Sequence, residues 1–188
     1  MDQRILIVDD FSPIAPFLRA DALKSDFIDW EGQDGEVYRR VCIKTIPGIQ
    51  ERIERIFGPV NMFGMGYRLN HSNEPPNAAI HSDLGWGTHA MVLYLCDGPG
   101  GTALWRHKAT GLETLLPGQV AEWHAVRGDW NDASAWEQTA MVELRFNRAV
   151  MYEGSYFHSR WPFEAFGHDA ETGRLTAVAF FTPQGAAK

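Results

Sequence analysis

The chain has 188 residues, which suits one domain with a substantial core and leaves little room for a second. Its formal charge of -7 argues against a protein that follows a nucleic-acid backbone, because such proteins need an excess of Lys and Arg. No apolar run approaches the roughly 20 residues that span a bilayer. The sequence therefore predicts neither a nucleic-acid partner nor a membrane segment, and the opening residues are not typical of a secretory signal.

The two cysteines, Cys42 and Cys96, are too few to suggest a disulfide framework. They are expected to be buried small apolar residues, and a cytoplasmic location is expected. Nothing in the sequence indicates an oligomeric state.

The first 59 residues predict a mixed segment of short strands and helices. Phe11–Phe27 has apolar residues near helical spacing, with Ser12 as a possible cap and Pro13 in the first turn. Ile49–Phe57 begins after Pro-Gly and stops at Gly-Pro, which predicts a second helix. Strands are expected at residues 4–8 and Tyr38–Ile43, with a turn at Glu31–Gly35.

From Val60 onward, short apolar runs alternate with Gly, Pro, Asn and Asp, which predicts a β-sandwich or barrel. The expected fold is mainly β, in a single domain 1–188, with residues 1–59 as N-terminal support and residues 60–185 as the β core. Gly128–Gln138 is expected to be a long loop over an opening. The expected strands are Phe63–Leu69, Ala78–Ser82, His89–Leu95, Thr102–His107, Gln119–Trp123, Met141–Phe146, Ala149–Tyr152, Ser155–His158 and Leu175–Phe181.

Metal-binding chemistry is suggested first by His81-Ser-Asp83. Residues i and i+2 of an extended chain point to the same side, so this imidazole and carboxylate can meet at one ion. Taken alone, the pair is better interpreted as a hydrogen-bonded His–Asp on a loop. His158, at the end of a later expected strand, completes a set of two histidines and one carboxylate, which covers one face of an iron ion and leaves positions open.

Arg174 and Thr176 are again i and i+2, at the start of the last expected strand. A guanidinium presents a planar fork to a carboxylate, and a hydroxyl two residues on adds a further hydrogen bond. The alternative for Arg174 is a surface arginine on an edge strand.

Together, His81-x-Asp83, the distant His158 and Arg174-x-Thr176 resemble the motif of the iron(II)/2-oxoglutarate-dependent oxygenases. Met91–Cys96 followed by Gly100–Trp105, and Asn147–Gly154 leading to His158, are also similar to strands of that family. The resemblance covers about residues 60 to 183. It implies a double-stranded β-helix, or jelly-roll, of the kind found in prolyl hydroxylases.

The resemblance also implies a function. His81, Asp83 and His158 would be the iron(II) ligands and the catalytic centre, and Arg174 and Thr176 would hold the far carboxylate of 2-oxoglutarate. With dioxygen, the cosubstrate would be converted to succinate and carbon dioxide while a C–H bond of a peptidyl side chain or small metabolite is hydroxylated. Tyr67 is a candidate contact to a 2-oxoglutarate carboxylate, and Tyr94 is a weaker one.

One spacing departs from the family pattern, since Arg174 follows His158 at a greater distance than is usual there. Arg160 is the fallback for the anchoring arginine. Two other classes stay open: a cupin-like metal enzyme, although no His-x-His occurs here, and a non-catalytic β-barrel module. The remaining histidines have no second ligand at metal spacing and are expected to be structural or solvated.

Overall fold

A computed structural model describes residues 4–31, 37–74, 79–83 and 85–185. The described strands form two sheets, and every pairing between them is antiparallel. The larger sheet has the order β1(Ile5–Val8), β8(Ala149–Glu153), β5(His89–Tyr94), β10(Arg174–Pro183), β4(Val60–Asn70), β3(Val37–Ile43), β2(Ile28–Glu31). The smaller has the order β7(Trp136–Glu143), β6(Gly101–His107), β9(His158–Trp161).

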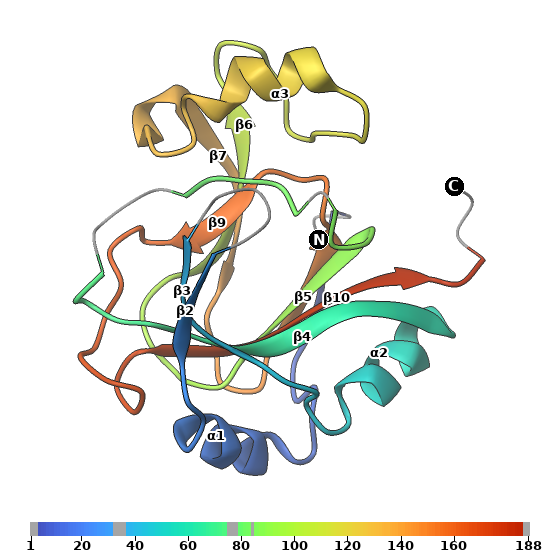
Figure 1. The fold of residues 1–188 in the computed structure, drawn as a ribbon, viewed down its shortest axis with the longest axis vertical. Helices are drawn as coiled ribbons and strands as arrows, with labels where there is room; N and C mark the ends of the chain where they lie inside the picture. The colour runs from blue at the N-terminus through green and yellow to red at the C-terminus, as the bar shows by residue number, and fades with distance from the viewer. Residues whose placement is uncertain (1–3, 32–36, 75–78, 84, 186–188) are drawn as a thin grey trace.

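Helices cover the outside of this β core. Helices α1(Ala15–Leu23) and α2(Ile49–Phe57) lie on the side of β4 and β10 away from the smaller sheet, and α3(Val120–Arg127) lies at the opposite end of the molecule beside β6 and β7 (Figure 1). The buried faces of α1 and α2, including Leu18, Ile49 and Ile53, belong to the main hydrophobic cluster. A second cluster joins Val126 of α3 to Trp136 on the smaller sheet.

Successive side chains of β10 point alternately to the hydrophobic core and to the candidate site. Leu175, Ala177, Ala179 and Phe181 are fully buried in the main cluster. The residues between them, 174, 176, 178 and 180, line a cavity on the other face. Directly opposed residues of antiparallel strands share a face, so this register also decides which residues of β4 face the cavity.

The predicted mainly β fold is confirmed. The prediction for α2 agrees with its observed bounds, whereas α1 is shorter than predicted and Ile28–Glu31 is a strand. Helix α1 has no side-chain cap hydrogen bond, and the Ser12 hydroxyl instead accepts from the Ile14 N–H at 3.3 Å.

Four expectations about the β segment are wrong. Gln119–Trp123 is no strand, since Val120–Arg127 is helical. Residue 158 begins a strand instead of ending one, and the loop expected at 128–138 ends at Trp136, which starts β7 and is buried. Residues 79–82 of the expected strand Ala78–Ser82 form only an isolated bridge at His81. Residues 32–35 of the expected turn and residue 78 of that strand lie outside the described residues.

The described residues before Val60 supply both helices and strands. Strand β1 pairs with β8, and β3 pairs with β4, so the N-terminal segment completes the larger sheet. Both cysteines are free, Cys96 buried and Cys42 half-buried. No helix among the described residues is long and apolar enough to cross a membrane.

Replacing Ile53 with Ala should lower the free energy of unfolding by roughly 2–5 kcal/mol, because the fully buried side chain would leave a cavity under α2. Urea unfolding measures this change. The control is Gln50→Ala on the exposed face of the same helix, which should change stability by under about 0.5 kcal/mol. Equal losses in the two variants would contradict the placement of α2.

Candidate active site: a metal-competent group in a basic cavity

A short backbone bridge brings the distant histidines together. His81 N–H donates to the His158 carbonyl at 3.1 Å, and His158 N–H donates to the His81 carbonyl at 2.8 Å. Asp83 N–H donates to the Gly154 carbonyl at 2.7 Å, which holds the carboxylate beside them. Main-chain hydrogen bonds therefore bring His81 and Asp83 next to His158, although the two segments are far apart in the sequence.

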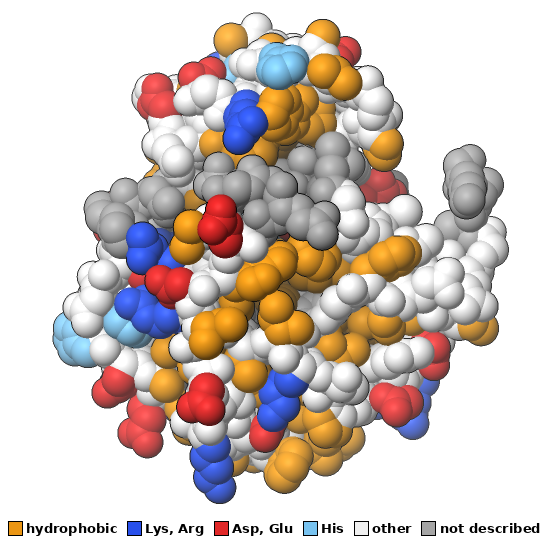
Figure 2. Space-filling view, in the orientation of Figure 1, with side chains coloured by type: hydrophobic (Ala, Val, Ile, Leu, Met, Phe, Trp, Pro, Cys, Tyr) orange, Lys and Arg blue, Asp and Glu red, His pale blue; other side chains and the backbone are white. Residues whose placement is uncertain are grey.

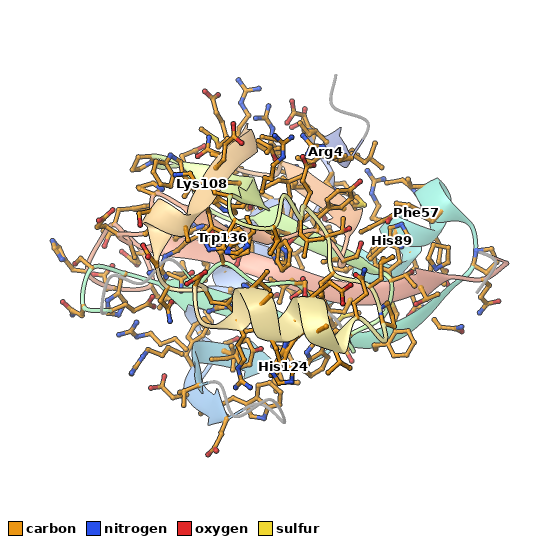
Figure 3. The ribbon with its side chains drawn as sticks, turned by 90° about the horizontal axis from the view of Figure 1, so that it is seen from above. Arg4, Phe57, His89, Lys108, His124 and Trp136 are labelled. Atoms are coloured by element: carbon orange, nitrogen blue, oxygen red, sulfur yellow. The ribbon has the colours of Figure 1, made fainter. Side chains whose placement is uncertain are left out.

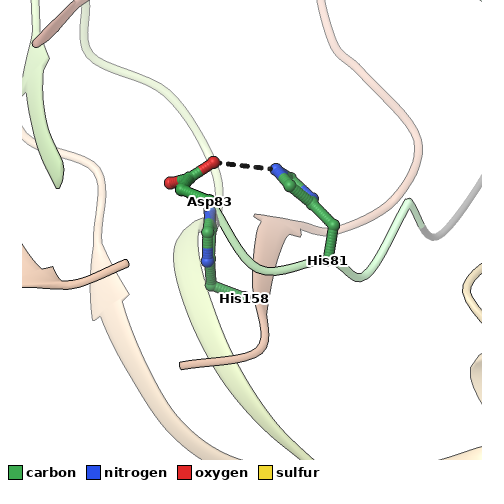
Figure 4. A group of neighbouring side chains, drawn as sticks. All are labelled: His81, Asp83 and His158. Atoms are coloured by element: carbon green, nitrogen blue, oxygen red, sulfur yellow. Dashed lines mark ion pairs between the residues drawn. The ribbon is translucent and has the colours of Figure 1, made fainter. Parts of the chain in front are cut away.

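The three side chains point their ligand atoms at one another (Figure 4). His81 Nε2 lies 3.5 Å from Asp83 Oδ1, and His158 Nε2 lies 3.2 Å from Asp83 Oδ2. Candidate ligand atoms of all three residues lie within 4.8 Å of one another. This arrangement meets the geometric requirement for a shared ion.

Backbone carbonyls set the orientation of both rings. His81 Nδ1 donates to the Ala79 carbonyl at 2.7 Å, and His158 Nδ1 donates to the Tyr156 carbonyl at 2.9 Å. A neutral imidazole has one N–H, so each Nε2 is left with a lone pair aimed at the carboxylate. Two lone pairs facing an anion require a cation between them.

The electrostatics of the group agree with this requirement. Burial alone would raise the pKa of Asp83, but the two histidines outweigh it and hold the pKa below its usual range. Burial alone would lower the pKa of His158, but Asp83 and the Tyr156 carbonyl raise it above its ordinary value. The group therefore attracts positive charge, which a proton or a metal ion can supply.

The group lies in a cavity of about 310 Å³ between the two sheets. Its wall holds the predicted Arg174 and Thr176 of β10, and Trp130 and Asn131 from the segment after α3. The structure therefore brings five of the six predicted site residues to one cavity: His81, Asp83, His158, Arg174 and Thr176.

Arg174 has the features of an anion anchor. It is 8% exposed, its Nε has no hydrogen-bond partner in the described part of the chain, and its guanidinium carbon lies 5.5 Å from the centre of the Tyr94 ring. A buried donor without a partner is costly, so this orphaned N–H fits a ligand carboxylate. Thr176 lies two residues away on the same face.

The fallback residue Arg160 also lines the cavity but is already paired. It donates to Glu74 at 2.6 Å, and Arg40 donates to the other oxygen of Glu74 at 2.7 Å. Arg174 therefore fits the role of anchor better than Arg160 does.

The expectation for Tyr67 needs correction. Tyr67 lies opposite Ala177, so it faces the core, and its hydroxyl donates to Asp21 at 2.9 Å. Burial and the Asp21 carboxylate raise its pKa above the ordinary value. Tyr94 is closer to the site. Its hydroxyl hydrogen-bonds the Thr102 hydroxyl at 2.7 Å, and its ring centre lies 5.5 Å from the Arg174 guanidinium carbon.

The sequence interpretation missed Arg68, Asn70 and Tyr152, which all line the cavity. The signal was present in β4, where Gly64, Gly66, Arg68 and Asn70 alternate with apolar residues. The register Arg68–Thr176 and Asn70–Arg174 makes that polar face continuous with the face of β10 that carries the predicted anchor.

Histidines outside the group have other roles. His89 packs against Phe57 beside α2, and His124 lies on α3, at 4.9 Å from the Trp123 ring (Figure 3). His107 is buried and bonds Thr110 and Asp129. Among the described residues, only His81, Asp83 and His158 form a metal-competent group.

Solved structures with similar folds include two non-haem α-ketoglutarate-dependent enzymes of nogalamycin biosynthesis. The epimerase SnoN has a TM-score of 0.56 at 18% identity, covering 98% of this chain and 82% of its own. The carbocyclase SnoK has a TM-score of 0.60 at 13% identity, covering 96% of this chain and 80% of its own. HygX from Streptomyces hygroscopicus, crystallised with nickel, 2-oxoglutarate and hygromycin B, has a TM-score of 0.55 at 13% identity, covering 97% and 83%.

The chain therefore has the fold of the non-haem 2-oxoglutarate-dependent enzymes. It belongs to the family of unknown function DUF6445, whose model matches residues 75–181. No curated protein matches the sequence.

Replacing His81, Asp83 or His158 with Ala should lower the affinity for Ni(II) at least about a hundredfold, because each change removes a direct ligand. Calorimetry measures the affinity, and the shift of Tm with metal gives a second reading. His124→Ala on α3 is the matched control and should bind like the wild type. Unchanged binding in Asp83→Ala would refute the site.

In the metal-free protein, the free energy of unfolding should depend on pH through the pair His158 and Asp83. The raised pKa of His158 contributes stability below about pH 6.5 that is lost as pH rises through the folded value. The lowered pKa of Asp83 contributes stability above about pH 4 that is lost on further acidification. With chelator present, the advantage of wild type over Asp83→Asn should be larger at pH 5.5 than at pH 8.

Urea unfolding at both pH values measures this difference, and the comparison with Asp83→Asn cancels the other titrating groups. An advantage that stays constant from pH 5.5 to 8 would show that His158 and Asp83 are not coupled.

Proposed function

We propose that this protein is a non-haem iron(II) enzyme that uses 2-oxoglutarate and dioxygen to oxidise its substrate, releasing succinate and carbon dioxide. Hydroxylation of a C–H bond, in a small metabolite or a peptidyl side chain, is the reaction proposed first. The observation that carries the proposal is the presence, in one cavity, of a converging His–Asp–His group and a buried arginine with an orphaned N–H.

The donor set fits iron. Two imidazoles and one carboxylate occupy one face of a six-coordinate ion and leave the other face open to small ligands. His81, Asp83 and His158 would hold the ion, and the Ala79 and Tyr156 carbonyls would keep both rings in the metal-binding tautomer.

The cosubstrate fits the opposite wall. Arg174 would take the far carboxylate of 2-oxoglutarate, with Thr176 beside it as a hydroxyl donor. Tyr94 behind the guanidinium, and Asn70 at 3.5 Å from it, would limit its movement. Support comes from SnoN, described in complex with Fe3+ and alpha ketoglutarate, and from HygX with nickel and 2-oxoglutarate.

Bound iron and 2-oxoglutarate would supply the oxidising chemistry, while the protein supplies position and shelter. Trp130 and Asn131 would cover the cavity from the α3 side, and Val178 and Phe180 would exclude water along β10. We also assign the two facing sheets as the double-stranded β-helix that this chemistry uses, with α1 and α2 flanking it.

A second candidate is a different oxidation on the same site. SnoN is an epimerase and SnoK a carbocyclase, so hydrogen removal followed by inversion or ring closure is the alternative to hydroxyl transfer. A cupin-like enzyme would need further histidine ligands, and the described residues offer no other metal-competent group.

Anaerobic addition of iron(II) and 2-oxoglutarate should give tight, stoichiometric binding of both, and admission of air should give succinate in step with 2-oxoglutarate loss. Arg174→Gln should weaken 2-oxoglutarate binding at least about tenfold, because it removes a charge-assisted hydrogen bond, and leave metal affinity unchanged.

Arg55→Gln, on the exposed face of α2, controls for the lost charge. Metal binding without 2-oxoglutarate binding would contradict the proposal and favour a cupin-like enzyme. Absence of both would favour a non-catalytic module.

A further inference from the structure

Two arginines of the cavity wall form no salt bridge with an acid among the described residues. The Nε atoms of Arg68 on β4 and Arg174 on β10 are buried, and neither has a hydrogen-bond partner there. Glu74, the acid on the same wall, is occupied by Arg40, Arg160 and Asn70. Arg68 and Arg174 therefore each keep one buried N–H that can donate to an anion.

The two arginines are close but not equivalent. Arg68 lies opposite Thr176 and Arg174 lies opposite Asn70, so they are diagonal neighbours, roughly 7–8 Å apart along the sheet. Burial and the proximity of Arg174 lower the pKa of Arg68. Holding two like charges this close is unfavourable unless anionic groups lie beside them.

The proposed function accounts for only one of them. Asp83 offsets half the charge of a divalent ion, and the two carboxylates of 2-oxoglutarate then balance the remainder together with Arg174. Arg68 is left with a positive charge inside the same cavity.

Aromatic rings continue the wall next to Arg68. Its guanidinium carbon lies 5.8 Å from the centre of the Tyr38 ring. Trp30 and Trp86 connect Tyr38 to Phe180 through ring-to-ring distances of 5.5, 5.7 and 5.5 Å. Tyr38 and Phe180 line the cavity, and hydrophobic side chains gather over β4 and β10 on this face of the molecule (Figure 2).

Resting on the proposed function, we infer that Arg68 binds an anionic group of the substrate, a carboxylate or a phosphate, whose flat apolar part lies against Tyr38 and Phe180. The substrate is a small molecule, because a cavity of about 310 Å³ is at the lower end of the range for ligand pockets, roughly 300–1,000 Å³, and also holds the cosubstrate. Arg68 is thus a specificity-determining residue, separate from the anchor Arg174.

The test uses phenylacetate and phenyl phosphate as probes, with phenylacetamide as the neutral analogue of the first. Each is titrated by calorimetry into Ni(II)-loaded protein saturated with 2-oxoglutarate. At least one acid should bind wild type about tenfold or more tightly than the amide. Arg68→Gln should abolish that preference, Arg68→Lys should restore part of it, and Arg55→Gln should keep it.

Two further readings separate this role from a structural one. Arg68→Gln should bind 2-oxoglutarate like the wild type, in contrast to Arg174→Gln. Its Tm without ligands should equal or exceed that of the wild type, because the change relieves repulsion between buried charges.

The inference is overturned if neither acid binds better than the amide, if Arg68→Gln keeps the preference, or if Arg68→Gln weakens 2-oxoglutarate as much as Arg174→Gln does. The last result would make Arg68 a second cosubstrate anchor. Failure of the wild type to bind 2-oxoglutarate would instead refute the proposed function. Acid binding to the unloaded protein that depends on Arg68 would still support the anion site.

Discussion

The site depends on one main-chain contact, the two-hydrogen-bond bridge between His81 and His158. It joins the segment before β5 to the start of β9 and so sets the distance between the two imidazoles. The carbonyls of Ala79 and Tyr156, each two residues before its histidine, then turn both Nε2 atoms toward Asp83. Because backbone groups determine this geometry, the ligands are positioned without support from long, flexible side chains.

The cavity that surrounds this group is made polar by strand alternation. On β4 and β10 one face is apolar and packs with α1 and α2 in the main cluster, while the other presents Arg68, Asn70, Arg174 and Thr176. Buried guanidinium groups without partners oppose folding, since a buried donor loses its hydration. Burial of apolar side chains in the main hydrophobic cluster offsets that cost. The N–H groups that lack a partner can then donate hydrogen bonds to anionic ligands. Glu74 reduces the excess of positive charge in the cavity by forming ion pairs with Arg40 and Arg160.

Particular residues show where sequence reasoning succeeded and where it failed. Ile49–Phe57 has glycine at both ends and an apolar face, and local signals of that strength predicted α2 correctly. Val120–Arg127 is also followed by glycine, but Val126 is its only buried residue, so it has no apolar face that predicts a helix. Val126 packs in the cluster that contains Trp136, and this tertiary packing stabilises the helix. Tyr67 was chosen by residue type, whereas its neighbour Arg68 has the correct parity to face the site.

The sequence by itself determined the chemistry available: metal-competent residues in His81-x-Asp83 and His158, and an anchor with a nearby hydroxyl in Arg174-x-Thr176, because i and i+2 spacing on extended chain places side chains on one face. Only the tertiary structure decided that these segments meet in one cavity, that Arg160 is neutralised while Arg174 is not, and that Arg68 joins them. The reason is physical. Strand alternation is a local property of the chain, but register and charge pairing arise between strands that are distant in sequence and become defined only when the sheets form.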